Sequence, residues 1–198
     1  VDLGALRLPG VHGMELRMTT TFPDISINTH RLVLRALEEA DVPALAEMMN
    51  DEMVAAWTTV PQPYPEDAAR GWITEYAPTE RTAGRGLDLA VTEFLTQRLV
   101  GVVQLSNTNW RVRSTEMSYI IAPWARGEGY ASEAAHATLE FALQDRGLDR
   151  VVAVNRSGNE ESENVIRKLG MKQDGNANDP ESGALLSLHS IDLTEYEA

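Results

Sequence analysis

Residues 123–131 have the sequence Pro123-Trp124-Ala125-Arg126-Gly127-Glu128-Gly129-Tyr130-Ala131, between a strand-like stretch at 115–122 and a long helical stretch at 132–144. Two glycines one residue apart allow a tight turn that brings backbone N–H groups close to a ligand. A helix that begins directly after such a turn adds unpaired amide donors and the positive end of its dipole. A strand, a glycine turn and a helix N-terminus together predict a cradle for an anion such as a pyrophosphate.

The two commonest phosphate motifs do not fit this stretch. The dinucleotide motif G-x-G-x-x-G lacks its third glycine, because Ser132 occupies that position. A Walker loop requires a Gly-Lys pair, and the chain contains none. The remaining pattern is a loose form of [RQ]-x-x-G-x-[GA] at residues 126–131. Taken alone, it leaves an ordinary turn as the alternative, because glycines are common in turns.

Length and composition indicate an ordinary globular protein. The 198 residues are 43% hydrophobic and 24% charged, and we expect residues 21–198 to form a single domain around one core. Residues 1–20 are expected to be a flexible N-terminal arm or a cloning remnant. The absence of cysteine excludes disulfides, thiolate metal sites and cysteine nucleophiles. Without a secretory signal or an apolar run of membrane-spanning length, the expected location is the cytoplasm.

The charge balance bears on partners. The formal net charge of −13 argues against nucleic-acid partners and against anionic membranes, which both attract basic proteins. A cationic substrate such as an amine would be attracted. No group of histidines and carboxylates has metal-ligand spacing, so no metal is expected. Both a monomer and a homodimer are compatible with the sequence.

Periodicity predicts one mixed α/β sheet, mostly antiparallel, with helices on both faces. Expected strands lie at 30–35, 87–94, 98–105, 114–121, 151–154 and 184–193. Expected helices lie at 38–50, 52–57, 65–76, 132–144 and 160–169, and Pro78 is expected to end the third of them. The segment 176–183 is polar and matches no pattern.

The second half of the chain resembles the GNAT acetyltransferase superfamily, in particular its ribosomal-protein alanine N-acetyltransferase (RimJ/RimL-like) branch. The branch pattern Pro-x-x-Arg-Gly-x-Gly-x-Ala-x-Glu-Ala matches residues 123–134. The pattern Asn-x-x-Ser-x-x-(Val/Leu)-x-x-Lys-Leu-Gly-Phe matches residues 159–171, with Met171 in place of the aromatic residue. The resemblance extends over about residues 28–195, and two ordered motifs are much more specific than either one.

The resemblance implies acetyl-coenzyme A as the ligand of the cradle. Its pyrophosphate would lie on the backbone amides, and its arm would contact the end of the preceding strand and a polar residue before the next helix. The cofactor-binding residues expected from the resemblance are Ile121, Arg126, Gly127, Glu128, Gly129, Tyr130, Ala131 and Asn159. Alternatives remain open for three of them: a solvated arginine for Arg126, a solvent-facing carboxylate for Glu128, and a helix N-cap for Asn159.

The resemblance also implies candidates for the chemistry. Ser162 matches the serine of the second motif and is the candidate general acid for the leaving thiolate; the alternative is a serine that only satisfies backbone amides. Glu116 is the candidate general base for the amine; the alternative is a surface carboxylate. Backbone N–H groups at 119–121 would stabilise the thioester oxygen if the strands separate there. Trp57, Tyr64 and Trp72 would border the acceptor cleft, with core packing as the alternative.

The predicted function is therefore transfer of the acetyl group of acetyl-CoA to a primary amine, by direct attack in a ternary complex. The acceptor would be a small-molecule amine or a peptide N-terminus. A different class remains open, namely an acetyl-CoA-binding sensor or assembly module without catalysis.

Overall fold

One mixed sheet organises the chain, and the computed structural model describes residues 20–180 and 182–196 of it. Apart from residue 20, the expected N-terminal arm lies outside the described residues. The sheet has eight strands in the order β1-β2-β3-β4-β5-β6-β8-β7. Their bounds are β1 Ile27–Asn28, β2 Leu32–Ala36, β3 Leu87–Glu93, β4 Leu99–Asn109, β5 Ser114–Ile121, β6 Arg150–Arg156, β7 Lys172–Asn178 and β8 Leu185–Asp192. The pairing is antiparallel except between β5 and β6, which confirms the predicted sheet.

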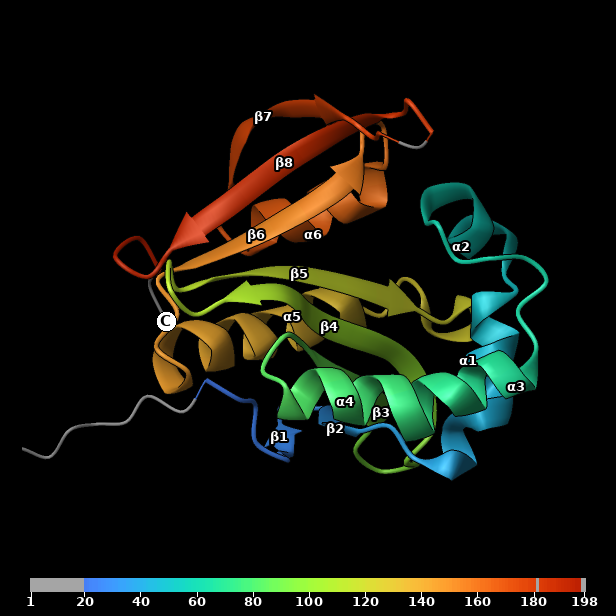
Figure 1. Ribbon diagram of the computed structural model, residues 1–198. Helices are drawn as coiled ribbons and strands as arrows, with labels where there is room; N and C mark the ends of the chain where they lie inside the picture. The colour runs from blue at the N-terminus through green and yellow to red at the C-terminus, as the bar shows by residue number, and fades with distance from the viewer. Residues whose placement is uncertain (1–19, 181, 197–198) are drawn as a thin grey trace, which may run out of the picture.

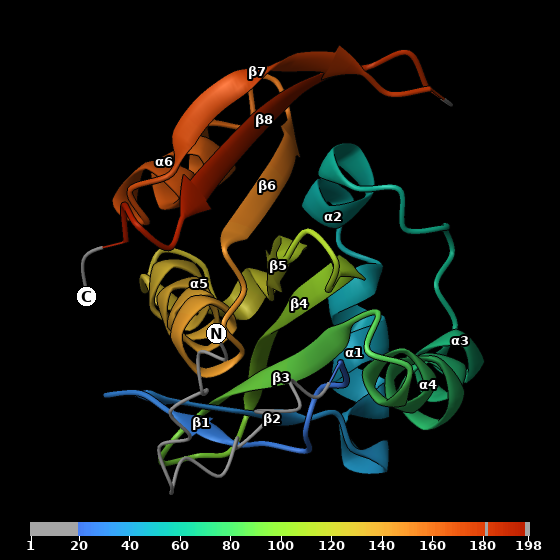
Figure 2. The ribbon, with the colours of Figure 1, turned by 60° about the vertical axis from the view of Figure 1, so that its left-hand side comes forward.

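Helices cover both faces of this sheet, as predicted (Figures 1 and 2). The α-helices are α1 Val42–Met49, α2 Glu52–Trp57, α3 Glu66–Gly71, α4 Ala77–Thr82, α5 Tyr130–Glu140 and α6 Glu160–Lys168. Short 3-10 helices, η1 Glu39–Asp41 and η3 Pro123–Ala125, and π-helical turns, η2 Trp72–Tyr76 and η4 Phe141–Asp145, adjoin them. The views show α1, α3 and α4 on one face of the sheet and α5 on the other.

Strand alternation divides the core between the two faces. In β3, Leu87, Leu89 and Val91 belong to the cluster beneath α5, whereas Ala90 belongs to the cluster beneath α1 and α3. Successive side chains of a strand point to opposite faces, so one strand can serve both cores. The same rule decides which β5 side chains face the helical wall of α1–α4 and which face α5 and α6.

The pairing of β5 with β6 is short, and this opens the sheet. Only residues 114–116 of β5 pair with residues 150–152 of β6. Beyond this point the two strands diverge, and Figure 1 shows β6 turning away toward β8 while β5 continues toward α1. The separation expected at residues 119–121 is therefore present.

One expectation about the elements needs correction, and one strand was not predicted. Pro78 does not end the helix of residues 65–76; it is the second residue of α4, which follows the π-helical turn η2 directly. The wider turn changes the hydrogen-bond pattern before the proline, so its missing N–H and its ring are accommodated. The polar segment 172–178 is a strand, β7, because it pairs along its length with β8. It is an exposed edge strand, and edge strands need not show apolar alternation.

In the described part of the chain, no helix combines the length and the apolar character that crossing a bilayer requires.

Candidate active site

The glycine turn has the geometry of an open cradle. Gly127 and Gly129 have φ values of +82° and +80°, a conformation that side-chain-bearing residues rarely adopt. Gly129 is the N-cap of α5, so the turn leads directly into the helix. A Cβ atom at Gly127 would meet no atom within 4 Å, and one at Gly129 would meet only Nη2 of Arg31, at 3.6 Å. The space in front of both glycines is therefore open.

Backbone donors line this open space. The amides from Arg126 to Ser132 donate to no carbonyl and to no side chain within residues 20–180 and 182–196. The first amides of any α-helix lack intrahelical partners, and here the preceding glycine turn adds more. Unpaired amides at the positive end of a helix dipole suit an anion with several oxygens. The cradle therefore fits the pyrophosphate of coenzyme A.

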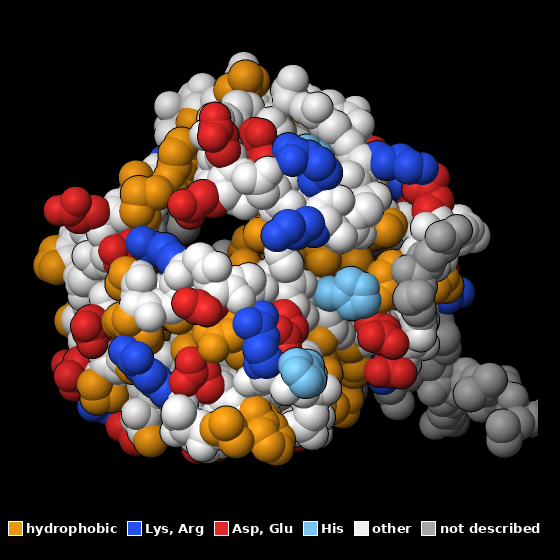
Figure 3. All heavy atoms as spheres, turned by 180° about the vertical axis from the view of Figure 1, so that it is seen from behind, with side chains coloured by type: hydrophobic (Ala, Val, Ile, Leu, Met, Phe, Trp, Pro, Cys, Tyr) orange, Lys and Arg blue, Asp and Glu red, His pale blue; other side chains and the backbone are white. Residues whose placement is uncertain are grey.

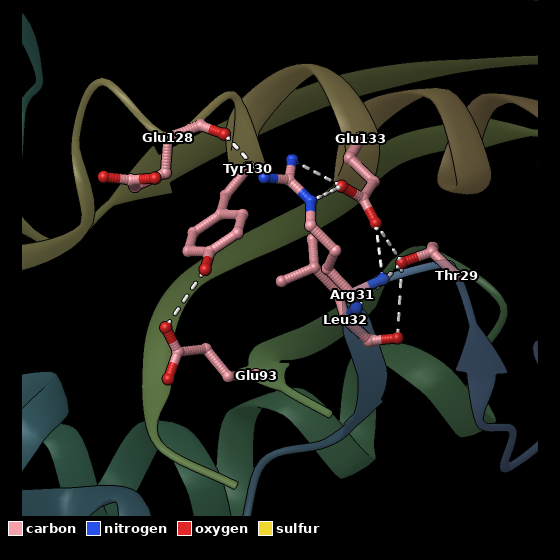
Figure 4. A network of polar contacts seen from close by, with 7 residues as sticks. All are labelled: Thr29, Arg31, Leu32, Glu93, Glu128, Tyr130 and Glu133. Atoms are coloured by element: carbon pink, nitrogen blue, oxygen red, sulfur yellow. Dashed lines mark hydrogen bonds and ion pairs between the residues drawn. The ribbon is translucent and has the colours of Figure 1, made fainter. Parts of the chain in front are cut away.

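A polar network fastens the cradle to β2, as Figure 4 shows. The Arg31 guanidinium donates from Nε to Glu133 Oε2 at 2.7 Å and from Nη1 to the Glu128 carbonyl at 2.9 Å, and it lies over the Tyr130 ring. Thr29 Oγ1 donates to Glu133 Oε1 at 2.6 Å. Burial would raise the pKa of Glu133, but the hydrogen bonds from Thr29 and Arg31 outweigh it and lower the pKa. Glu133 therefore stays ionised and holds Arg31 beside the turn.

Sequence reasoning missed this network. Arg31 was recognised only as part of a strand, although it lies near the cradle across about a hundred residues of chain. Glu133 is the glutamate of the first motif, so its position in that motif was the available signal. Its partner could not be identified without the tertiary structure.

Arg126 faces away from the open cradle and toward α2. Its guanidinium forms an ion pair with Asp51, which also caps α2 by accepting from the amides of Met53 and Val54. The hydrogen bond from Arg126 holds the pKa of Asp51 below its ordinary value. The expected contact between Arg126 and a phosphate stays a prediction, and in this structure the side chain binds a carboxylate instead.

The second motif begins α6, and its two polar residues contact each other. Asn159 is the N-cap, and its Oδ1 accepts from the Ser162 amide at 3.1 Å, which confirms the capping role. Its Nδ2 donates to no described residue. The Tyr119 hydroxyl lies 3.1 Å from both Oγ and the carbonyl oxygen of Ser162. Burial raises the pKa of Tyr119 to about 12, so this phenol remains protonated. The Tyr119 hydroxyl is a further polar group of the site that sequence reasoning had not identified.

Glu116 and the Tyr119–Ser162 pair lie on opposite sides of β5. Residues 116 and 119 are an odd number apart, so their side chains point to opposite faces of the strand. Glu116 is half-buried, and its Oε2 accepts from Asn107 Nδ2 at 2.9 Å. The two candidate groups thus flank the strand where it separates from β6. That arrangement suits an acid and a base that act on one reacting group from two sides.

The open edge of β5 carries free backbone donors. The Ala122 amide donates to the Val100 carbonyl of β4 at 2.9 Å, so the amides of Tyr119 and Ile121 face the opposite edge by strand alternation. Ile121 lies opposite Gly101, where a Cβ atom would come within 2.7 Å of Ile121 Cδ1 and 2.6 Å of the Ile120 carbonyl. Gly101 therefore permits the close approach of the two strands at this point.

Helix α2 spans the gap between the separated strands. The Arg156 guanidinium, at the end of β6, donates to the Ala56 carbonyl of α2 at 2.8 Å. Together with the pair of Arg126 and Asp51, this contact holds α2 from two sides. The space-filling view from behind shows an opening between the upper part of the molecule and the lower part (Figure 3). It lies in the region where Figure 1 shows β5 and β6 diverging, on the side of α2.

Comparison with known proteins agrees with this geometry. A family model described as an acetyltransferase (GNAT) domain matches residues 31–172. The Bacillus subtilis (strain 168) protein YkkB is 30% identical over 148 residues, which are 72% of this chain and 83% of YkkB. Mycobacterium smegmatis RimJ, solved in complex with CoA-disulfide, has a TM-score of 0.74 at 20% identity and covers 83% of each chain.

A second solved structure is a spermidine N-acetyltransferase from Vibrio cholerae in complex with CoA and spermine. Its TM-score is 0.72 at 20% identity, and the match covers 85% of this chain and 99% of that one. At such identities the solved structures establish the fold, and the family model extends the match to most of the sequence. The chain therefore belongs to the GNAT acetyltransferase family and is an acetyl-CoA-dependent N-acetyltransferase.

Proposed function

We propose that this enzyme transfers the acetyl group directly to a primary amine, with Glu116 as general base and Ser162, backed by Tyr119, as general acid. The observation that carries the proposal is the placement of Glu116 and the Tyr119–Ser162 pair on opposite faces of β5 at its separation from β6. Direct transfer needs no protein nucleophile, which agrees with a chain that has no cysteine.

The residues of the cradle would hold the pyrophosphate. The unpaired amides from Arg126 to Ser132, which include those of Gly127, Gly129, Tyr130 and Ala131, supply the donors. Glu128 contributes its amide, and its carbonyl binds Arg31. Asn159 keeps Oδ1 for its cap and has Nδ2 available for a carbonyl of the pantetheine arm. The amide of Ile121 faces the same open edge.

Acetyl-CoA supplies an acetyl thioester, and the protein supplies position, charge and protons. Glu116 accepts a proton from the acceptor ammonium, and the hydrogen bond from Asn107 fixes one oxygen of its carboxylate. The Tyr119 amide donates to the thioester oxygen as negative charge develops on it. As the tetrahedral intermediate collapses, Ser162 Oγ donates its proton to the departing sulfur and recovers one from the Tyr119 hydroxyl at 3.1 Å. The nitrogen releases its second proton to solvent, solvent returns a proton to Tyr119, and Glu116 then loses the proton that it accepted, so each turnover releases one net proton. The high pKa of Tyr119 keeps that proton in place until it is needed.

The test is release of free thiol from acetyl-CoA with a panel of amines and short peptides. We expect release with at least one acceptor, and an approximately 100-fold lower kcat for Glu116→Gln at neutral pH. Glu47→Gln, a change at an exposed carboxylate on α1, is the matched control and should leave kcat unchanged. Binding of acetyl-CoA without thiol release from any acceptor would contradict the proposal and favour a binding module. Equal kcat for Glu116→Gln and the parent would remove Glu116 from the mechanism.

A further inference from the structure

A pocket of about 470 Å³ lies on the helical-wall face of the sheet, and one of its lining residues, Ser106, pairs with Glu116 of β5. Tyr76 and Glu80, from the wall formed by η2 and α4, line one side of it. Asp88 and Gln104, from the sheet, line the other. The volume lies in the range of small-molecule pockets. Neither the cofactor cradle nor the Tyr119–Ser162 pair contributes to its walls.

Asp88 is a buried carboxylate that no cation neutralises. Its exposed fraction is 7%, and its two oxygens accept from Trp72 Nε1 at 3.3 Å and from Gln104 Nε2 at 2.5 Å. Both donors are neutral, and within the part of the chain that the structure describes no lysine, arginine or histidine contacts this side chain. Burial raises the pKa of Asp88, which the two hydrogen bonds offset only in part. An unpaired buried carboxylate is costly, and a cation from outside would compensate it.

The rest of the pocket leaves this charge uncompensated. Arg85 is a cation that lines the pocket, and it donates to both oxygens of Glu80, with Nη2–Oε1 at 2.5 Å and Nε–Oε2 at 3.0 Å. This pair is neutral as a unit, so the pocket is negative at Asp88. Each Asp88 oxygen accepts one hydrogen bond from the described residues and has a second lone pair for another donor.

Asp88 lines this pocket, and Glu116 lies on the same face of the sheet, two strands away. Asp88 pairs with Gln104, Gln104 with Ser118, and Ser106 with Glu116, so three neighbouring strands present these side chains on one face. The two residues are two strands apart across the sheet and two residues apart along it. This places their Cα atoms roughly 10 to 12 Å from each other. Asn107 lines the pocket and donates to Glu116, which connects the pocket to the candidate base.

We infer that Asp88 is a specificity-determining residue which binds a second protonated nitrogen of the acceptor while the reacting amine lies at Glu116. The inference rests on the proposed function and names the acceptor class as a dication. Trp72 and Gln104 hold the carboxylate toward the pocket. The predicted cleft residue Trp72 thus serves both core packing and the pocket, because its ring packs on the second core cluster and its N–H orients Asp88.

The first experiment compares acceptors with the unaltered enzyme. Linear α,ω-diamines of increasing length are compared with monoamines of the same chain length, with thiol release as the measurement. We expect the diamines to have a KM at least about 10-fold lower, as for a hydrogen bond between charged groups. The preference should weaken as salt is added. Equal KM values for the matched diamines and monoamines would overturn the inference without any variant.

The second experiment uses Asp88→Asn, with Glu75→Gln at an exposed carboxylate of the same wall as the matched control. We expect Asp88→Asn to raise the KM for diamines about 10- to 100-fold and to change the KM for monoamines little. The Kd for acetyl-CoA and kcat should stay unchanged. An equal rise for both amine classes would show that Asp88 only supports Trp72 and Gln104.

Calorimetry of a diamine with the enzyme in the presence of CoA gives a readout without turnover. Binding that disappears in Asp88→Asn would support the pocket even if no acceptor in the panel were acetylated, a result that would overturn only the proposed function. No binding to the unaltered protein, together with normal turnover of monoamines, would overturn the inference alone.

Discussion

The cofactor cradle and the acceptor pocket are built on opposite principles. The cradle is one continuous stretch, Arg126 to Ser132, whose donors are backbone amides. The pocket combines side chains from β3, β4, η2 and α4, and its specificity depends on one carboxylate, Asp88. Backbone donors are the same for any sequence that adopts the turn, so the cradle suits a substrate common to a whole family. Side chains can be exchanged one at a time, so the pocket suits the substrate that differs between members.

Helix α2 connects the cradle to β6. Arg126 of the cradle binds Asp51 at the start of this helix, and Arg156 of β6 binds the Ala56 carbonyl near its end. A change in the cradle that moves Arg126 can therefore alter the position of α2, the helix that spans the separated strands. Three variants test how separate the two regions are.

The largest effect is expected for Gly129→Asp. The new carboxylate would enter the cradle, and a φ of +80° strains any side-chain-bearing residue. We expect the Kd for acetyl-CoA to rise more than about 100-fold, as measured by calorimetry. Gly183→Asp is the matched control, because Gly183 has φ +70° and also has open space around it. Unchanged affinity in a folded Gly129→Asp variant would show that the cradle does not bind the cofactor.

An intermediate effect is expected for Ser162→Ala, which removes the hydroxyl beside Tyr119 but keeps the α6 backbone. We expect kcat to fall about 100-fold while the Kd for acetyl-CoA changes less than about 3-fold. Tyr119→Phe should lower kcat by a smaller factor, because Ser162 keeps its own proton and loses only the group that returns it. Stopped-flow measurement of the first turnover separates the acetyl-transfer step from product release. Normal first-turnover rates in both variants would exclude the hydroxyl pair.

The smallest effect is expected for Asp51→Asn. Asparagine caps a helix about as well as aspartate, so the change removes the charge that holds Arg126 and keeps α2 capped. We expect acetyl-CoA to bind about two- to five-fold more tightly at low salt, because Arg126 becomes free for the anion, and this gain should vanish at high salt. Weaker cofactor binding would instead mean that the Arg126–Asp51 pair supports the cradle.

The same variant makes a prediction about pH. The pKa of Asp51 is lowered in the folded state, so its ion pair contributes stability fully above the ordinary value of 3.8. That contribution is lost as the pH falls through the lower folded-state value. Between about pH 5 and pH 3, the melting temperature of the parent should therefore fall further than that of Asp51→Asn. Parallel melting curves against pH would show that the pair adds no stability.

Some of the fold could be predicted because local patterns were strong. The strand Ser114–Ile121 and the helix Glu52–Trp57 have the expected bounds, since one alternates between buried and half-buried side chains and the other is capped by Asp51. The strand Lys172–Asn178 could not be predicted, because its polar residues are held by pairing with β8 and bury little. The helix that continues through Pro78 was missed because it depends on a π-helical turn.

The residues of the candidate site also fall into those that the sequence could reveal and those that it could not. The two glycines were recognisable because the turn that they form is a local structure. Asn159 and Ser162 were recognisable because they match a motif of the family, and the helix cap expected as the alternative for Asn159 is also local. Other contacts of the site join residues that are far apart in the sequence, and these could not be recognised. They are the ion pair of Arg126 with Asp51, the hydrogen bond of Arg31 with Glu133, and the contact of the Tyr119 hydroxyl with Ser162.

Local geometry and long-range packing therefore account for different parts of this enzyme. The order of residues 126–131 predicted either an anion cradle or an ordinary turn, because backbone conformation depends on near neighbours and glycine is its clearest signal. The second motif, at residues 159–171, favoured the cradle. The negative pocket at Asp88 arises only when two strands and a helical wall come together and bury a carboxylate that pairs with no cation of the described residues. No local pattern specifies such an environment, since burial and charge pairing are properties of the assembled tertiary structure.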